Sequence, residues 1–188
     1  QMLWSPADNW EARLIVSAER ARDGDYALND LAAVRATPFS VSRDFEGHTS
    51  RDIVAPTVLV RRTGGAVDIS AVTGFVRWET DDLTDLDYTT WPLATRANNE
   101  RDFQFTEEVR FTPAKDSALA LSDAVGLKWQ AGVSVFTQRY KQEAVNSYAP
   151  FVLSPLVSIP TSQLSPRAAL DDKGLGLYGE TTLTLGGR

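Results

Sequence analysis

The fold is decided by an alternating stretch at residues 127–140, LKWQAGVSVFTQRY. Its apolar side chains recur at every second position, from Leu127 through Trp129 to Val135, and the residues between them are polar or small. Phe136 is the one large apolar residue out of step. Successive side chains of a β-strand point to opposite faces of a sheet, so this pattern predicts a strand with one apolar and one polar face.

Five further stretches alternate in the same way. They lie at Trp10–Arg20, Thr49–Arg62, Ala66–Glu79, Arg101–Thr112 and Gly174–Leu185. The connections are alternately short and long, and the long ones fall at residues 21–48, 80–100 and 141–173. This alternation is typical of antiparallel strands that form a wall with one plain end and one elaborated end.

The stretches are also long for a globular protein. Strands of globular proteins average about five or six residues, whereas a tilted strand that crosses a bilayer needs about nine to eleven. We therefore expect an all-β protein: an antiparallel up-and-down transmembrane β-barrel wall of about six strands. It would be a partial barrel with long extracellular loops.

A soluble β-sandwich or small calyx that binds a ligand is the alternative, because strands of soluble sheets also alternate. The stretch at Thr49–Arg62 is irregular, since Pro56 cannot donate to a ladder and predicts a bulge or a local break. The two folds differ in whether the apolar face is an exposed belt or a packed core. The residues that distinguish them are Phe103, Phe105, Trp129, Val133 and Leu177.

Two short connections contain residues that favour turns. Gly64 and Gly65 can supply the positive φ that a tight hairpin needs, and Pro113 fixes φ at the start of a longer turn. Residues 5–9 precede the first expected strand and residues 186–188 follow the last. We therefore expect both chain ends to lie at turns on the plain end of the wall.

The composition excludes several classes of function. The net charge is −6 and the basic residues form no cluster, which argues against a nucleic-acid-binding surface. The absence of cysteine removes disulfides, thiolate zinc sites and thiol nucleophiles. The sequence has no apolar run long enough for a transmembrane helix, and residues 1–6 do not resemble a signal peptide. We expect either a cytoplasmic protein or an internal piece of a longer chain.

Four segments resemble the barrel of TonB-dependent outer-membrane receptors. Residues 105–114, FTEEVRFTPA, are similar to that family's F-[ST]-Q-E-[LV]-R-[LF] strand and the turn after it. Residues 127–136, LKWQAGVSVF, are similar to its W-x-A-G-[LV]-[FY]-[FY] strand, and residues 69–75, ISAVTGF, to its [LI]-x-S-[IV]-T-[GS]-[YF] strand. Residues 171–179, DDKGLGLYG, resemble the segment where the receptor chain re-enters the membrane. The segments follow the family's order and cover about residues 10–188.

The resemblance implies that residues 1–188 are a single segment of a receptor β-barrel domain in the bacterial outer membrane, with no plug domain present and the TonB box absent. It implies active uptake of siderophore, cobalamin or carbohydrate-type nutrients. The implied partners are outer-membrane lipid and lipopolysaccharide, the rest of the barrel and its plug, TonB, and a nutrient ligand such as a ferric siderophore. Glu107 departs from the pattern, because the family usually has Gln there and the position belongs to the apolar face.

The residues expected to bind a ligand lie in the long connections, because binding residues project from the elaborated end of such a wall. The densest acidic cluster comprises Asp81, Asp82, Asp85 and Asp87. Hard cations bind several oxygen atoms, so the cluster could hold calcium or a cationic ligand, but we favour a solvated acidic loop and expect no metal site. Arginines near the loop bases could hold an anionic siderophore or a lipopolysaccharide phosphate, or balance nearby acids, which we favour. They are Arg43, Arg51, Arg96 and Arg101.

For the aromatic residues near the strand ends we favour a role in interfacial girdles or loop packing over ligand stacking. Those in the loops could stack on a ligand. The full set of candidate ligand-binding residues is Asp81, Asp82, Asp85, Asp87, Tyr88, Trp91, Arg96 and Tyr148.

Catalysis has little support in the sequence. His48 is the only histidine, and an esterase would have to combine it with Ser50. No motif positions an oxyanion hole beside these residues. We therefore expect no enzymatic activity and no cofactor.

Overall fold

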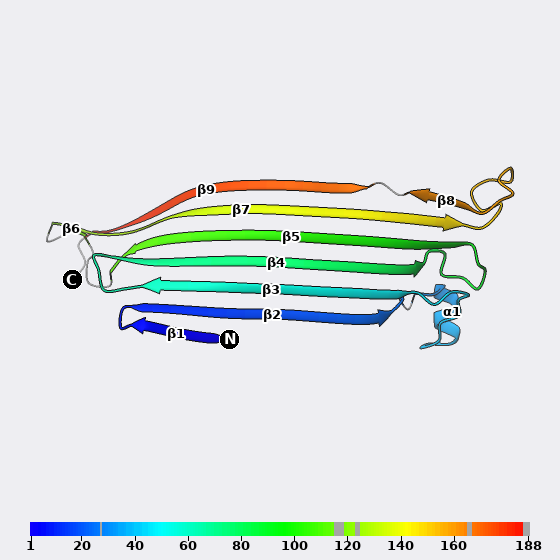
Figure 1. Cartoon of the computed structure of the whole chain (residues 1–188), viewed down its shortest axis with the longest axis horizontal. Helices are drawn as coiled ribbons and strands as arrows, with labels where there is room; N and C mark the ends of the chain where they lie inside the picture. The colour runs from blue at the N-terminus through cyan, green and yellow to red at the C-terminus, as the bar shows by residue number, and fades with distance from the viewer. Residues whose placement is uncertain (27, 115–118, 123–124, 165–166, 186–188) are drawn as a thin grey trace.

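The computed structural model describes residues 1–26, 28–114, 119–122, 125–164 and 167–185. In this part of the chain nine strands pair in one antiparallel sheet, and one short helix lies beside an end of it (Figure 1). The elements are β1 (Met2–Ala7), β2 (Trp10–Gly24), α1 (Leu31–Ala36), β3 (His48–Arg62), β4 (Val67–Asp85), β5 (Ala94–Pro113), β6 (Leu119–Ser122), β7 (Val125–Tyr148), β8 (Thr161–Leu164) and β9 (Ala168–Leu185).

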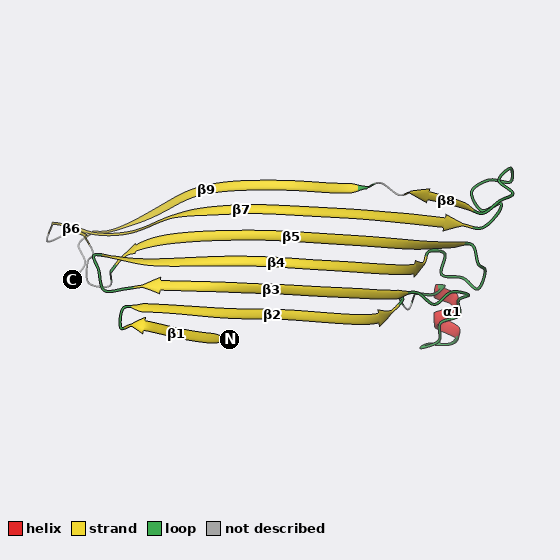
Figure 2. Cartoon of the chain, viewed as in Figure 1, coloured by secondary structure: helices red, strands yellow, loops and turns green. Residues whose placement is uncertain are grey.

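The strands run up and down, so each long strand lies beside its neighbour in the sequence. The order is β1-β2-β3-β4-β5-β7, after which β9 pairs along β7, with β6 and β8 pairing near the two ends of β7. The sheet does not close on itself. The three long connections gather at one end, to the right in Figure 2, together with α1. The expected all-β, up-and-down architecture is confirmed.

The six expected strands correspond to β2, β3, β4, β5, β7 and β9, and most of them are longer than predicted. β7 extends over 24 residues, to Tyr148, and β9 begins at Ala168 instead of Gly174. Alternation disappears near the loop end because both faces become polar there, but the backbone ladder continues. The loops are correspondingly shorter than expected.

The start of the chain was predicted wrongly. Residues 2–7 form β1, which pairs with β2 from Met2 opposite Leu14 to Ala7 opposite Trp10. The N-terminus therefore lies part-way along the wall and not at a turn on its plain end (Figure 1). Pro6 is tolerated because β1 is an edge strand and its register is interrupted between Trp4 and Ala7. The C-terminal residues 186–188 lie outside the described residues.

The turn and proline predictions hold in part. Gly64 has φ +84°, the positive value that the β3–β4 turn needs, whereas Gly65 does not have a positive φ. The pairing of β3 with β4 is interrupted at Ala55 and Pro56 but keeps the same register on both sides. Pro56 therefore causes a local break in the ladder and no bulge.

One face of the sheet carries continuous apolar rows. A single cross-strand row runs through all the long strands and contains no polar residue: Trp4, Ala12, Val60, Ala71, Val109, Val133 and Leu177. On β2 this face extends from Trp10 to Ala18, and the eight steps between these residues span about 26 Å along the strand at about 3.3 Å each. Polar residues interrupt the neighbouring rows of this face: Arg62 lies opposite Trp10, and Glu107 accepts a hydrogen bond from the Thr73 hydroxyl at 2.5 Å.

Along the central strand β5 the polar face is the more buried one. Asn98 is 8% exposed and Asp102 is 5% exposed, whereas Phe103 on the apolar face is 43% exposed. Ala144 is the one buried apolar side chain among the described residues whose exposure is known. No packed apolar core is therefore present in the described part of the chain. Of the residues chosen to distinguish wall from sandwich, Phe103 and Leu177 are exposed and Phe105, Trp129 and Val133 are partly exposed.

Towards the loop end the apolar face gives way to charged side chains. A cross-strand row there consists of Arg20, Asp52, Glu79, Arg101 and Lys141. Arg20 pairs with Asp52 at 3.5 Å, and Glu79 pairs with Arg77 at 2.7 Å. The apolar band is thus bounded on its loop side by a charged rim.

Candidate functional site

The structure places most of the predicted ligand-binding residues in strands and not in loops. Asp81, Asp82 and Asp85 belong to β4, Arg96 to β5, and Tyr148 ends β7. Asp87, Tyr88 and Trp91 lie in the connection between β4 and β5. The expectation that all eight residues project from loops is wrong, because the ladder between β4 and β5 continues as far as Asp85 opposite Thr95.

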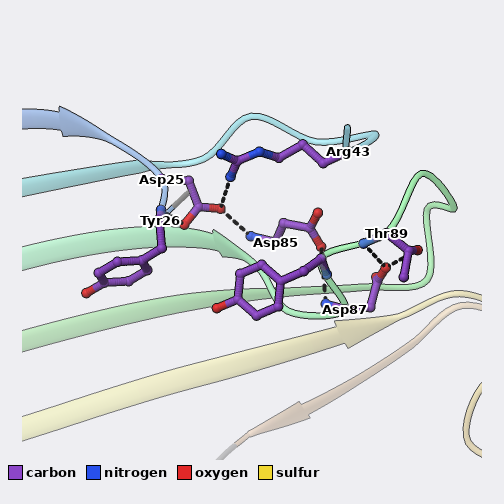
Figure 3. A network of polar contacts seen from close by, with 7 residues as sticks. Asp25, Tyr26, Arg43, Asp85, Asp87 and Thr89 are labelled. Atoms are coloured by element: carbon purple, nitrogen blue, oxygen red, sulfur yellow. Dashed lines mark hydrogen bonds and ion pairs between the residues drawn. The ribbon is translucent and has the colours of Figure 1, made fainter. Parts of the chain in front are cut away.

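A compact polar cluster forms where β4 ends, and its centre is a pair of buried carboxylates (Figure 3). The side chain of Asp25 is 1% exposed, and its Oδ2 accepts a hydrogen bond from the backbone N–H of Asp85 at 2.7 Å. Arg43 Nη1 lies 3.3 Å from the same oxygen. The connection after β2 is thereby attached to the end of β4. Gly47 permits this approach, since a Cβ there would lie 1.8 Å from the carbonyl oxygen of Leu83.

Asp85 organises the turn that follows β4. Its Oδ1 accepts hydrogen bonds from the backbone N–H groups of Asp87, at 3.1 Å, and of Tyr88, at 3.0 Å. Tyr88 has φ +53°, an uncommon value for a non-glycine residue that these bonds help to hold. Burial, followed by the nearby Asp25 and Asp85 carboxylates, raises the pKa of the Tyr88 hydroxyl.

Asp87 closes the same turn from the other side. Its Oδ1 accepts hydrogen bonds from the backbone N–H and the hydroxyl of Thr89, and its Oδ2 accepts one from the Ala94 N–H at 2.7 Å. Burial acts to raise the pKa of the Asp87 carboxyl, but the hydrogen bonds from Thr89 and from the backbone outweigh it and hold that pKa below its usual value. Asp87 therefore stays ionised at neutral pH.

Asp44 also joins this cluster, although it was not among the predicted ligand-binding residues. Its backbone N–H donates to the carbonyl oxygen of Thr89 at 3.2 Å, and a carboxylate oxygen of Asp44 lies within 4.8 Å of one from Asp85 and one from Asp87. No sequence signal indicates this contact, because Asp44 and Asp85 are far apart in the chain.

The other candidate residues are dispersed. Asp81 pairs with His48, with Oδ1 and Nε2 3.0 Å apart, and both side chains are about half exposed. Arg96 Nη1 lies 3.5 Å from Asn146 Oδ1, at the limit of a hydrogen bond. Trp91 is 69% exposed. The structure therefore separates Asp81, Arg96 and Trp91 from the cluster at Asp85 and Asp87.

Two of the arginines near the loop bases pair with acids. Arg51 donates to Glu19 at 2.7 Å and Arg43 faces Asp25, as expected of residues that balance nearby carboxylates. Arg101 lies on the charged rim instead. It borders a shallow depression of about 290 Å³ that is also lined by three other basic residues, two acids and one aromatic residue: Arg77, Arg139, Lys141, Glu79, Asp102 and Phe103.

The polar face holds a hydrogen-bond network whose residues are not among the predicted ligand-binding residues. Gln142 Nε2 donates at 3.0 Å to both Asn98 Oδ1 and Glu100 Oε1, and Gln138 Nε2 donates to Asp102 Oδ1 at 2.9 Å. The rings of Trp78 and Tyr140 flank this network with centroids 6.0 Å apart. The signal was present in the sequence, because these residues occupy the polar positions of alternating strands.

These arrangements offer two kinds of binding surface. The loop-end cluster presents carboxylate oxygens, and the polar face presents amides, carboxylates and two aromatic rings. No helix in the described part of the chain is long and apolar enough to cross a bilayer. Comparisons with protein-family models, with curated proteins and with solved structures find no match.

Proposed function

We propose that the chain forms part of the wall of an outer-membrane β-barrel that takes up nutrients, of the TonB-dependent receptor type. In this arrangement the apolar face contacts lipid and the polar face lines the lumen. The loop end faces the outside of the cell. The transported molecule belongs to the siderophore, cobalamin or carbohydrate-type nutrients that the resemblance implies.

The inverted burial of the two faces carries this proposal. In a soluble sandwich the apolar face is the buried one. On the central strand β5, Asp102 is 5% exposed on the polar face, while its neighbour Phe103 is 43% exposed on the apolar face. A barrel wall has this arrangement, because its lipid-facing side chains point away from the protein and its lumen-facing side chains crowd together.

The dimensions and the charged rim support the same conclusion. The apolar band measures about 26 Å along β2 and about 20 Å in height if the strands tilt by about 40°, close to the roughly 25 Å of outer-membrane barrels. Beyond the band, Arg101, Arg139 and Lys141 face the same side. Basic side chains at this height suit the phosphate groups of lipopolysaccharide.

The lumen-facing network suits a polar cargo. Asn98, Asp102 and Gln142 offer donors and acceptors next to the Trp78 and Tyr140 rings. Aromatic faces together with amides and carboxylates contact polyhydroxylated or amide-rich molecules well, since the rings cover apolar edges and the polar groups pair with hydroxyl and amide groups. The candidate residues of the loop end would form the entry to this lumen.

Single-tryptophan variants test which face contacts lipid. Trp129 belongs to the apolar face and Trp78 to the polar face, so each is retained alone while the other tryptophans are replaced by Phe. In vesicles of brominated phospholipid we expect strong quenching of Trp129 fluorescence and little quenching of Trp78. Equal quenching of both residues, or none of either, would overturn the lipid-facing assignment and favour the soluble fold.

Uptake is tested in the cells that make the protein. Deletion of its gene is expected to abolish uptake of one radiolabelled nutrient among a ferric siderophore, cobalamin and an oligosaccharide, and uptake in the parent strain should stop when the proton-motive force is collapsed. Unchanged uptake of all three classes would refute the transport proposal while leaving the membrane assignment to the quenching experiment.

A further inference from the structure

We propose that Asp44, Asp85 and Asp87 form a calcium-binding site at the loop end of the sheet. The three carboxylates come from two segments that are distant in the sequence, residue 44 and residues 85–87, and one oxygen of each lies within 4.8 Å of the others. Calcium binds oxygen ligands at about 2.3–2.6 Å, so oxygens separated by up to about 5 Å can share one ion. This inference does not rest on the proposed transport function.

An unpartnered oxygen atom on Asp85 points independently to a ligand. Asp85 is 1% exposed, and its Oδ2 has no hydrogen-bond partner in the described part of the chain, while its Oδ1 accepts two backbone N–H groups. A buried carboxylate oxygen without a partner is costly, because the group has lost its hydration. A cation coordinated by Oδ2 would remove that cost.

The charge balance of the cluster also favours a divalent cation. The cluster contains four carboxylates, those of Asp25, Asp44, Asp85 and Asp87, and one guanidinium, that of Arg43, so its formal charge is −3. Arg43 is engaged with Asp25, at 3.3 Å. The three carboxylates of the proposed site therefore lack a positive partner of their own within the described contacts, and a doubly charged ion offsets most of their mutual repulsion.

The ligand chemistry selects calcium among divalent cations. The site offers only carboxylate oxygens, and the chain contains no cysteine. His48, the single histidine, pairs with Asp81 and lies outside the cluster. Zinc prefers nitrogen and sulfur ligands, and magnesium demands near-ideal octahedral geometry. Calcium accepts irregular oxygen cages, and water and backbone carbonyls would complete its shell.

Binding would add a further link between the β2–β3 connection and the end of β4. Asp44 belongs to the segment between β2 and β3, Asp85 is the last residue of β4, and Asp87 lies in the connection between β4 and β5. With three carboxylates in a partly exposed position, we expect a dissociation constant on the order of 10⁻⁴ M, as in extracellular calcium modules. At the calcium concentration found outside cells the site would be occupied, and the ion would hold the two segments together.

The test measures calcium and terbium binding by the full chain in the medium in which it is monodisperse. We expect saturable calcium binding by titration calorimetry, and terbium luminescence sensitised by Tyr88 that calcium competes away. Asp44→Asn is the main variant, because Asp44 is exposed and its loss does not disturb the strands. This variant should raise the dissociation constant for calcium at least tenfold, because the ion loses one charged ligand.

Asp85→Asn and Asp81→Asn complete the experiment. Asn at 85 keeps an oxygen for the two backbone N–H groups, so this variant should fold and also bind calcium at least tenfold more weakly. Asp81→Asn removes a carboxylate from the same end of the sheet but outside the cluster, and should bind calcium as the unmodified chain does. Lack of saturable binding up to 10 mM calcium, on the order of 100 times the expected dissociation constant, would overturn the site. Equal weakening in all three variants would also overturn it, by assigning the effect to general negative charge.

Discussion

Two adjacent residues of β2 allow the face assignment to be tested by a charge. Val16 lies on the apolar face, where it is 55% exposed, and the exposed Ser17 lies on the polar face at almost the same height. The variants Val16→Lys and Ser17→Lys therefore introduce the same side chain in the same strand. They differ only in the face on which the ammonium group emerges.

The expected cost depends on what covers the apolar face. A Lys at the bilayer midplane of a barrel wall costs about 2–4 kcal/mol, and the cost falls towards the interfaces. Val16 is one cross-strand row from the middle of the band, so we expect Val16→Lys to lower the free energy of unfolding by about 2 kcal/mol, roughly a 30-fold change in the unfolding equilibrium. If water covers the face, an exposed substitution changes stability by no more than about 0.5 kcal/mol.

Urea titration in phospholipid vesicles, followed by the β-sheet circular dichroism signal, measures both variants. We expect Val16→Lys to unfold at clearly lower urea and Ser17→Lys to unfold within about 0.5 kcal/mol of the unmodified chain. Equal stability of the two variants, together with a monodisperse unmodified chain in detergent-free buffer, would refute the assignment of the apolar face to lipid.

Three further predictions concern single positions. Gly47→Ala should destabilise the loop end by more than about 1 kcal/mol, since its Cβ would meet the Leu83 carbonyl oxygen at 1.8 Å, and hydrogen exchange should locate the loss around the end of β4. Glu107→Leu should raise the urea midpoint in vesicles, because it removes a carboxylate from the apolar face at the cost of one hydrogen bond from Thr73; a lowered midpoint would contradict this. The folded-state pKa of Asp87 lies below its usual value, so its stabilising effect is present at neutral pH and is lost as the pH falls below about 4. With EDTA present, hydrogen exchange of the β4–β5 connection should accelerate over that range, and Asp87→Asn should abolish the pH dependence.

The central part of each long strand could be predicted from the sequence because alternation is strong where one face is apolar. Residues 127–140 alternate clearly and lie within β7, whereas residues 141–148 are polar on both faces and extend β7 without a periodic signal. β1 was missed for a different reason: Pro6 argues against a strand, and only the partner β2 shows that an edge position tolerates it.

Only half of the loop-end cluster could be predicted from the sequence: Asp85 and Asp87 were candidates, and Asp25 and Asp44 were not. The run of aspartates in residues 81–87 is visible in the sequence, but strand geometry divides it. Asp81 turns to His48, while Asp85 and Asp87 meet Asp25 and Asp44. Those partners come from a connection whose path depends on Gly47 and on the Arg43–Asp25 ion pair. Contacts of this range follow from tertiary structure and leave no local pattern.

Alternation alone does not decide which face of a sheet is the inside, and the exposure of the apolar face favours the proposed wall over a sandwich. A sandwich would need a second layer over Leu175, Leu177 and Val135, which are 74%, 80% and 41% exposed. The described part of the chain supplies no such layer, since its one helix lies at the loop end (Figure 2). The proposed cover of the apolar face is lipid, and the alternative is a protein partner. A protein would need a complementary apolar surface over the whole band, and it would tolerate Lys at position 16 no better than lipid does. Quenching of Trp129 by brominated lipid distinguishes these two occupants, because only lipid carries the quencher.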